Sequence, residues 1–203
     1  MARRSDHSRD EIREMALSAV EELVSKKGYE GLSARKVAAA IGYTVGTLYL
    51  VFENLDDLVV QVNARTLDRL NLQMMEAVEE IGDDRQRLMG LGQSYIRFAE
   101  EDPHLWEMVF KHRVPRNGQL PAWYQEKVSR MFAQVERCLK PIAGHKTPGE
   151  IAQAARALWG GVHGICILAV TGKLGGVGVE SVPDLAESLL SNYLDGFTGS
   201  WNP

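Results

Sequence analysis

Apolar residues recur every three or four positions along most of this chain, which is the spacing of one face of an α-helix. The clearest stretch follows Ser8, where Ser8-Arg9-Asp10-Glu11 has the form of a capping box and apolar residues then repeat as far as Val24. Gly28 is placed to end this helix, because glycine readily adopts the left-handed backbone that follows many helices. No stretch alternates convincingly between apolar and polar residues, as a half-buried strand would.

Capping residues and prolines divide the remaining chain into further helices. The predicted helices after the first cover residues 33–40, 44–52, 54–80, 84–101, 102–112, 121–139, 147–173 and 183–197. Thr147-Pro148-Gly149-Glu150 is the most specific of the start signals, because it combines a capping box with proline at the first helical position. The sequence therefore predicts an all-α fold, with a loop over 113–120 and a flexible connection over 175–178.

The short helices over 33–40 and 44–52 have the pattern of a helix-turn-helix. Such a unit needs a small residue where its two helices pack and a glycine at the turn between them. Ala38 and Gly42 meet both needs and lie four residues apart. The second helix then presents short hydroxyls, aromatic rings and one branched apolar side chain, which suit contacts with DNA phosphates and a thymine methyl. An αα-hairpin without a DNA role has the same spacing, so spacing alone leaves both interpretations open.

Charge adds modest support for a nucleic-acid partner. The formal net charge is −4, yet residues 1–52 hold eight Lys or Arg against seven Asp or Glu. Only this end of the chain leans basic, and Arg3, Arg4 and Arg9 could form a basic arm. A solvated charged face would show a similar balance, so charge by itself favours neither reading.

The composition also excludes several classes of protein. The cysteines, Cys138 and Cys166, are too few for a disulfide framework or a zinc site. The N-terminus lacks the apolar core of a signal peptide, and the most apolar run, 157–172, is shorter than a bilayer span. We therefore expect a cytoplasmic protein with no membrane partner, no metal and no cofactor.

The stretch from Ser8 to Leu58 resembles the DNA-binding domain of the tetracycline-repressor (TetR) family, over about fifty consecutive residues without a gap. The resemblance implies an N-terminal three-helix helix-turn-helix domain, residues 1–53, joined to a larger helical domain, residues 54–203, for ligand binding and dimerisation. It also implies a homodimer that inserts residues near 33–50 into the major groove of a double-stranded operator. The matching pieces are Ile12 with Ala16 and Ala19, Gly28-Tyr29-Glu30-Gly31, Leu32-Ser33-Ala34-Arg35, Val37-Ala38, Ile41-Gly42, Gly46-Thr47-Leu48-Tyr49, Phe52 and Leu58.

The same resemblance implies roles for individual residues. By position, Thr47 and Tyr49 look like phosphate contacts, and Arg35 looks like a backbone contact from the preceding helix. Tyr43, Thr44 and Val45 look like the residues nearest to base edges. The residues expected to bind DNA are therefore Ser33, Arg35, Tyr43, Thr44, Val45, Thr47 and Tyr49.

Val51 and Leu55 depart from the family pattern, which often has His or Tyr at the first position and Lys at the second. Both family side chains reach phosphate, and neither replacement can. These departures motivate an alternative function, a ligand-binding or interaction protein whose helix-turn-helix no longer binds DNA.

A second, shorter resemblance lies in the C-terminal half. Trp159-Gly160-Gly161-Val162-His163-Gly164 looks like the Trp-His-Gly pattern of one TetR C-terminal subgroup. His163 follows Trp159 by four residues, on the same helical face, and could bond a ligand oxygen. A buried histidine satisfied by a backbone carbonyl is the interpretation we favour.

Ligand pockets are mostly apolar with a few polar groups, so aromatic and apolar residues of this half are candidate pocket residues. They predict a fairly apolar small-molecule effector. Tyr95 could also line such a cavity. The residues expected to contact the effector are Phe98, Trp106, Phe110, Trp123, Met131, Trp159, His163 and Cys166.

The last two helices are expected to pack against a two-fold copy as a four-helix bundle. The predicted function is a transcriptional repressor that leaves its operator when the effector binds. An enzyme with a Cys166–His163 nucleophile is a remote alternative, because a thiol in so apolar a helix tends to stay inert. The residues expected at the dimer interface are Ile151, Leu158, Val162, Leu185, Leu189, Tyr193 and Phe197.

Overall fold

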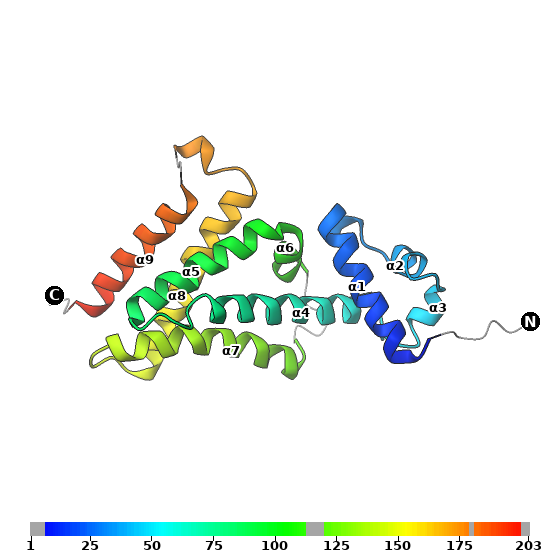
Figure 1. The fold of residues 1–203 in the computed structure, drawn as a ribbon, viewed down its shortest axis with the longest axis horizontal. Helices are drawn as coiled ribbons and strands as arrows, with labels where there is room; N and C mark the ends of the chain where they lie inside the picture. Colours follow the sequence, from blue (N-terminus) through cyan, green and yellow to red (C-terminus); the bar gives the residue numbers. More distant parts are fainter. Residues whose placement is uncertain (1–6, 113–119, 179–180, 200–203) are drawn as a thin grey trace, which may run out of the picture. The chain divides into compact units, whose positions relative to one another are not determined.

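The computed structural model describes residues 7–112, 120–178 and 181–199, and the regular structure in these ranges is entirely helical, as the all-α prediction requires (Figure 1). The chain divides into two compact units. The N-terminal unit is Met1–Leu67 with Asp102–Tyr124, and the C-terminal unit is Asp68–Glu101 with Gln125–Pro203. These units differ from the predicted domains 1–53 and 54–203, because one long helix begins in the first unit and ends in the second.

The N-terminal unit is built on α1 (Arg9–Lys27), η1 (Tyr29–Gly31), α2 (Ala34–Ala40) and α3 (Val45–Leu48). It also contains α6 (Pro103–Lys111) and the first part of α4 (Leu55–Glu76). One apolar cluster holds these helices together, because each α-helix contributes buried side chains to it and η1 packs Tyr29 against it. Buried members of the cluster include Val20, Val37, Leu48, Leu58 and Met108, with Phe52 from the turn after α3.

The start and end of α1 are as the sequence predicts. Ser8 Oγ accepts a hydrogen bond from the Glu11 backbone amide at 3.2 Å, and the Glu11 carboxylate accepts one from the Ser8 amide at 2.6 Å. Gly28 follows the helix with a positive φ of 72°, which favours glycine. The capping box thus fixes the first helix of the unit.

The predicted helix over 44–52 is too long. α3 ends at Leu48, and the chain continues through turns in which the Leu50 amide donates to the Thr47 carbonyl and the Val51 amide donates to the Leu48 carbonyl. These bonds span three residues rather than four, so the backbone tightens and the α-helix stops. Apolar periodicity cannot distinguish such turns from another turn of α-helix.

The C-terminal unit contains the end of α4, together with α5 (Asp84–Glu101), α7 (Ala122–Leu139) from Gln125 onward, α8 (Pro148–Val170) and α9 (Val182–Thr198). Short turns η2 (Lys140–Ile142) and η3 (Gly175–Val177) connect them. α5, α8 and α9 pack on one another, and glycines let them approach closely. A Cβ atom at Gly92 would lie 2.7 Å from Leu190, and one at Gly161 would lie 2.5 Å from Leu189.

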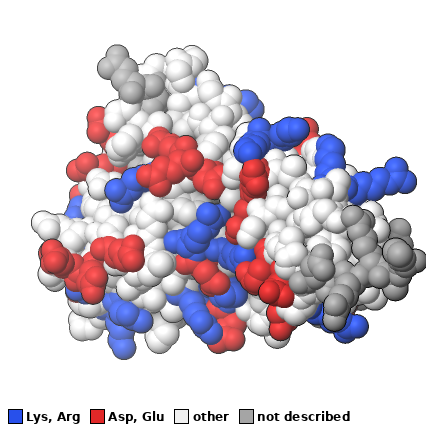
Figure 2. Space-filling model, turned by 45° about the vertical axis from the view of Figure 1, so that its right-hand side comes forward, with Lys and Arg blue, Asp and Glu red and all other residues white. Residues whose placement is uncertain are grey.

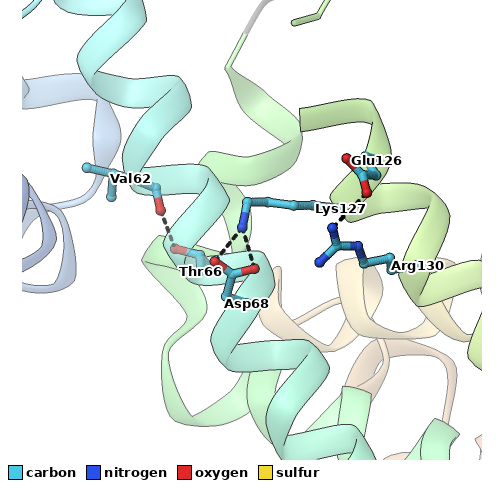
Figure 3. Close-up of polar contacts among 6 residues, drawn as sticks. All are labelled: Val62, Thr66, Asp68, Glu126, Lys127 and Arg130. Carbon is cyan, nitrogen blue, oxygen red and sulfur yellow. Dashed lines mark hydrogen bonds and ion pairs between the residues drawn. The ribbon is translucent and has the colours of Figure 1, made fainter. Parts of the chain in front are cut away.

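An ion pair also connects α7 to α4. Lys127 Nζ donates to both carboxylate oxygens of Asp68 at 2.6 Å (Figure 3). Within α7, Arg130 pairs with Glu126 at 2.7 Å. Because these groups are largely exposed, each pair stabilises the fold by about 1 kcal/mol at most.

α8 is long and apolar enough to cross a membrane by length and composition alone. This is weak support for a membrane span, because core helices of soluble proteins meet the same criterion. α8 buries Ala154, Leu158, Val162 and Cys166 within the unit. Its apolar character therefore already has a partial explanation inside the chain.

Candidate nucleic-acid interface and ligand cavity

The turn between α2 and α3 sets the geometry of the candidate DNA interface. Gly42 has a φ of 74°, a left-handed conformation that turns the chain between the helices. The next amide, that of Tyr43, donates to the Ala38 carbonyl at 2.9 Å. Leu48 and Val37 are fully buried, so their packing fixes the two helices against each other.

Two of the predicted DNA residues cap the helices. Ser33 Oγ accepts from the Lys36 amide and starts α2, and Thr44 Oγ1 accepts from the Thr47 amide at 3.2 Å and starts α3. Thr44 Oγ1 also lies 3.0 Å from Thr47 Oγ1. Both hydroxyls of α3 are thereby held at the N-terminal end of the helix, where backbone amides favour an anion such as phosphate.

The other predicted DNA residues remain accessible to varying degrees. Tyr49 is 44% exposed and Arg35 is exposed, whereas Val45 and Tyr43 are half-buried. The Tyr43 hydroxyl lies 2.7 Å from His7 Nδ1, so the start of the described chain contacts this surface. In Figure 2, Lys and Arg side chains are interspersed with Asp and Glu on the visible face, in keeping with the balanced composition.

Val51 and Leu55 have packing roles. Both are half-buried against the apolar cluster of the N-terminal unit. The Val51 carbonyl accepts a hydrogen bond from Arg13 Nη2 at 3.1 Å, and the Arg13 guanidinium lies over the Phe52 ring at 5.2 Å. Substituting apolar residues at these positions therefore strengthens the core where the family often places phosphate contacts.

The C-terminal unit contains an apolar chamber of about 50 Å³. Of the residues expected to contact the effector, only Trp159 lines this chamber. Tyr95, which the sequence also suggested as a cavity residue, lines it as well. The other lining residues were not identified from the sequence, since a pocket wall and an ordinary core position share the same apolar pattern. They are Met74, Leu88, Leu91, Gly92, Val135, Leu158, Val162 and Leu190.

His163 is not among the residues that line the chamber. Its Nδ1 lies 2.9 Å from the Tyr95 hydroxyl, and its ring stacks on Trp159 with centroids 5.0 Å apart. Burial lowers the pKa of His163 below its ordinary value, which favours the neutral imidazole. His163 thus holds two residues of the chamber wall in place.

The remaining predicted effector residues lie away from the chamber. Trp106, Phe110 and Trp123 belong to the N-terminal unit, where Trp106 is buried and the other two are exposed. In the C-terminal unit, Phe98 and Cys166 are buried in the core and Met131 is half-buried. Being aromatic or apolar did not by itself show which of these residues would line the chamber.

The thiol of Cys166 is unsuited to nucleophilic catalysis. Burial, together with the smaller effect of the nearby Glu100 carboxylate, raises the pKa of this thiol to about 12. A thiol with this pKa stays protonated at neutral pH. Among the described residues, no three His, Cys, Asp or Glu side chains gather as a metal site would require.

Two of the predicted dimer residues are misplaced. Leu158 and Val162 are buried within the single chain and line the apolar chamber, so they are not available to a partner. Ile151, Leu185, Leu189, Tyr193 and Phe197 are half-buried. The most exposed large apolar side chains of α8 are instead Ile167 and Leu168, at 37% and 41%. The prediction from the helical period chose Leu158 and Val162 for the exposed face of α8, whereas the structure exposes Ile167 and Leu168. Because both faces of this helix are apolar, the sequence could not tell the two faces apart.

The fold has counterparts among solved structures. A protein of unknown function from Rhodococcus sp. RHA1 is 22% identical with a TM-score of 0.77, over 98% of this chain and 100% of that one. A TetR-like transcriptional regulator from the same organism is 18% identical with a TM-score of 0.66, over 93% of this chain and 97% of that one. At these identities the likeness concerns the fold.

Family assignment rests on the sequence. The family model described as bacterial regulatory proteins of the tetR family matches residues 16–62, and the one described as the tetracyclin repressor-like C-terminal domain matches residues 88–193. The chain therefore belongs to the TetR family of transcription regulators. The family assignment drawn from Ser8–Leu58 is confirmed, while the Trp-His-Gly subgroup stays a prediction.

One curated relative has a stated function. The HTH-type transcriptional activator FasR of Mycolicibacterium smegmatis is 27% identical over 114 residues, which are 56% of this chain and 52% of the relative. The match thus spans about half the length of that relative. Regulators of the family bind DNA operators, dimerise and bind small-molecule ligands.

Proposed function

We propose that this protein is a cytoplasmic homodimer that represses transcription by binding a palindromic operator and leaves it when a small molecule occupies the C-terminal unit. The observation that supports this most directly is the capped helix α3. It holds Thr44 and Thr47 at its N-terminal end, with Tyr49 exposed just beyond it. Thr47 and Tyr49 are the proposed phosphate contacts, and Val45, beside Tyr43 and Thr44, is the proposed base-reading residue.

The dimer interface we propose is formed by the exposed side of α8 together with α9. Ile167 and Leu168 supply apolar area, and Gly160 has no atom within 4 Å of where a Cβ would be, so a second helix could approach closely there. Tyr193 and Phe197 of α9 stack with ring centroids 6.2 Å apart and remain half-buried. A partner would bury the rest of these rings.

The proposed link between effector and operator is helix α4. This helix is continuous from Leu55, which packs on the core beneath α3, to Glu76, and Met74 near its end lines the apolar chamber. A ligand that shifts the end of α4 can therefore change the fit of two reading heads that must enter successive major grooves at once. Coupling of about 1–3 kcal/mol would weaken operator binding about 5- to 150-fold.

In-vitro selection from a random DNA pool tests the DNA-binding part of this proposal. We expect enriched palindromes whose half-sites lie about 34–36 Å apart or a multiple of that distance, and an affinity that falls steeply with salt. Selection that enriches no sequence would support the alternative of a degenerate helix-turn-helix. A transcription reporter carrying the selected site then gives the sign of regulation, which matters because the curated relative is named an activator.

A further inference from the structure

A second cavity lies in the C-terminal unit, between the end of α4, α5 and α7. Its volume is about 220 Å³, and it is lined by Glu79, Arg87, Leu91, Gln134 and Arg137 together with Met75, Val78 and Cys138. We call it the polar hollow. Glu79 and Arg137 are exposed, so its rim faces solvent, whereas the apolar chamber is walled mainly by buried residues. The larger of the two spaces is therefore the polar one.

The polar hollow and the apolar chamber are neighbours that share one lining residue. Leu91, which is 3% exposed, lines both. On the two flanking helices, adjacent residues divide between the spaces. Met75 faces the hollow and Met74 the chamber, while Gln134 faces the hollow and Val135 the chamber. Leu91 is therefore the residue through which one ligand could contact both the polar hollow and the apolar chamber.

Size argues that a ligand uses both spaces. Pockets for drug-sized ligands measure about 300–1,000 Å³. The chamber at about 50 Å³ is far below that range, and the hollow at about 220 Å³ is closer to it. An apolar molecule confined to the chamber would have to be very small. A molecule that extends past Leu91 could occupy both the chamber and the hollow.

The hollow also has the chemistry of an anion site. Two guanidinium groups and one carboxamide face one carboxylate, Glu79. Arg87 is partly engaged, because its Nε donates to the Ile81 carbonyl and its Nη1 lies 3.7 Å from Asp84. Arg137 has no hydrogen-bond or ion-pair partner among the residues that the structure describes, so its donors are available. A guanidinium with free donors binds carboxylate strongly and with two parallel hydrogen bonds.

We propose that the effector is an organic carboxylate with an unbranched apolar tail. Its head group binds Arg137 and Gln134 in the polar hollow, and its tail displaces the Leu91 side chain to occupy the apolar chamber against Trp159. This proposal rests on the proposed function, because it names the ligand class of the same C-terminal unit. It differs from the sequence-based expectation of a mainly apolar molecule by requiring a negative charge.

Calorimetric titration of the full-length protein with octanoate and with 1-octanol tests the charge requirement. We expect octanoate to bind about tenfold or more tightly than 1-octanol, since a charge-assisted hydrogen bond carries that much affinity. Arg137→Gln should abolish this preference while leaving the affinity for 1-octanol unchanged. Arg130→Gln is the matched control, because Arg130 lies on the same helix, pairs with Glu126 and lines neither cavity.

A charge-reversal variant distinguishes loss of the head-group contact from loss of binding through misfolding. Arg137 is exposed, so Arg137→Glu should fold with an unchanged melting temperature and should prefer octylammonium to octanoate. Equal affinity of the unaltered protein for octanoate and 1-octanol would overturn the proposal. An octanoate preference that survives in both Arg137 variants would overturn it as well.

Parallel titrations with operator DNA separate this proposal from the proposed function. Octanoate that binds with the expected Arg137 dependence but leaves operator affinity unchanged supports the site and contradicts ligand-controlled release. Operator release by 1-octanol and octanoate alike, at equal concentrations, supports the proposed function and overturns the carboxylate requirement.

Discussion

The two units of this protein use the same helical periodicity for different purposes. The N-terminal unit packs six helical segments, including α4 and α6, around one apolar cluster, and short side-chain caps fix where α1, α2 and α3 begin. The C-terminal unit uses longer helices that approach at glycines and leave two cavities between them. Local caps therefore set where the short helices of the first unit begin, whereas the close approach of α5, α8 and α9 depends on contacts between residues far apart in sequence.

This difference shows where sequence reasoning works. A cap or a glycine turn acts within four residues, so its effect can be read directly from the chain. Whether an apolar residue lines a chamber, fills a core or faces a partner depends on what lies opposite it in space. Leu158 illustrates this, because its helical position suited a dimer surface and the structure places it in the chamber wall.

The largest effect is expected at the proposed dimer surface of the C-terminal unit. Ile167→Glu would place a carboxylate in an apolar interface, where an unpaired charge is costly. We expect monomers by light scattering and a loss of operator affinity of roughly 100-fold or more, because two half-sites are no longer bound together. Val177→Glu is the control, since Val177 is the most exposed apolar residue of this unit and lies on η3. Dimers that persist in Ile167→Glu would place the interface elsewhere.

A change of similar size, in stability rather than in assembly, is expected from a cavity in the N-terminal core. Leu48 is fully buried at the end of α3, so Leu48→Ala should lower the free energy of unfolding by about 2–5 kcal/mol in urea denaturation. Leu50, two residues further along and 65% exposed, provides the matched control. Leu50→Ala should change the free energy of unfolding by less than about 0.5 kcal/mol. Similar decreases in the free energy of unfolding for both variants would contradict the assignment of Leu48 to the core and Leu50 to the surface.

The next effect concerns DNA rather than stability. Tyr49→Ala should weaken binding to selected and random DNA equally, because a phosphate contact carries no base information. Val45→Ala should instead change the preference at one base pair, by about 1–3 kcal/mol. Fluorescence anisotropy on both kinds of DNA measures the two effects. Equal losses for Val45→Ala on both would show that another residue reads the base.

The smallest effect is the pH dependence of the C-terminal unit. The pKa of His163 is lowered by burial, so the unfolded chain takes up a proton more readily than the folded chain. The stability that His163 contributes is therefore present above its ordinary pKa of about 6.5 and is lost as pH falls below that value. His163→Gln should reduce this acid sensitivity in urea denaturation, whereas His145→Gln, at an exposed site, should leave it unchanged. An unaltered pH slope in His163→Gln would contradict the assignment.

The sequence by itself determined the all-α fold, the bounds of most helices and the family. It did so because capping boxes at Ser8 and Thr147, the glycine turn at Gly42 and the gap-free match over Ser8–Leu58 are all local patterns. It also placed Thr44 at the start of the reading helix, where the structure has it as the cap.

Only the tertiary structure decided the internal sites. It showed that His163 Nδ1 lies within hydrogen-bond distance of the Tyr95 hydroxyl, and that Leu91 lines both an apolar chamber and a polar hollow. Each of these depends on which side chains meet across helices that are distant in sequence. Apolar periodicity gives a helix its buried face but carries no information about what that face will touch.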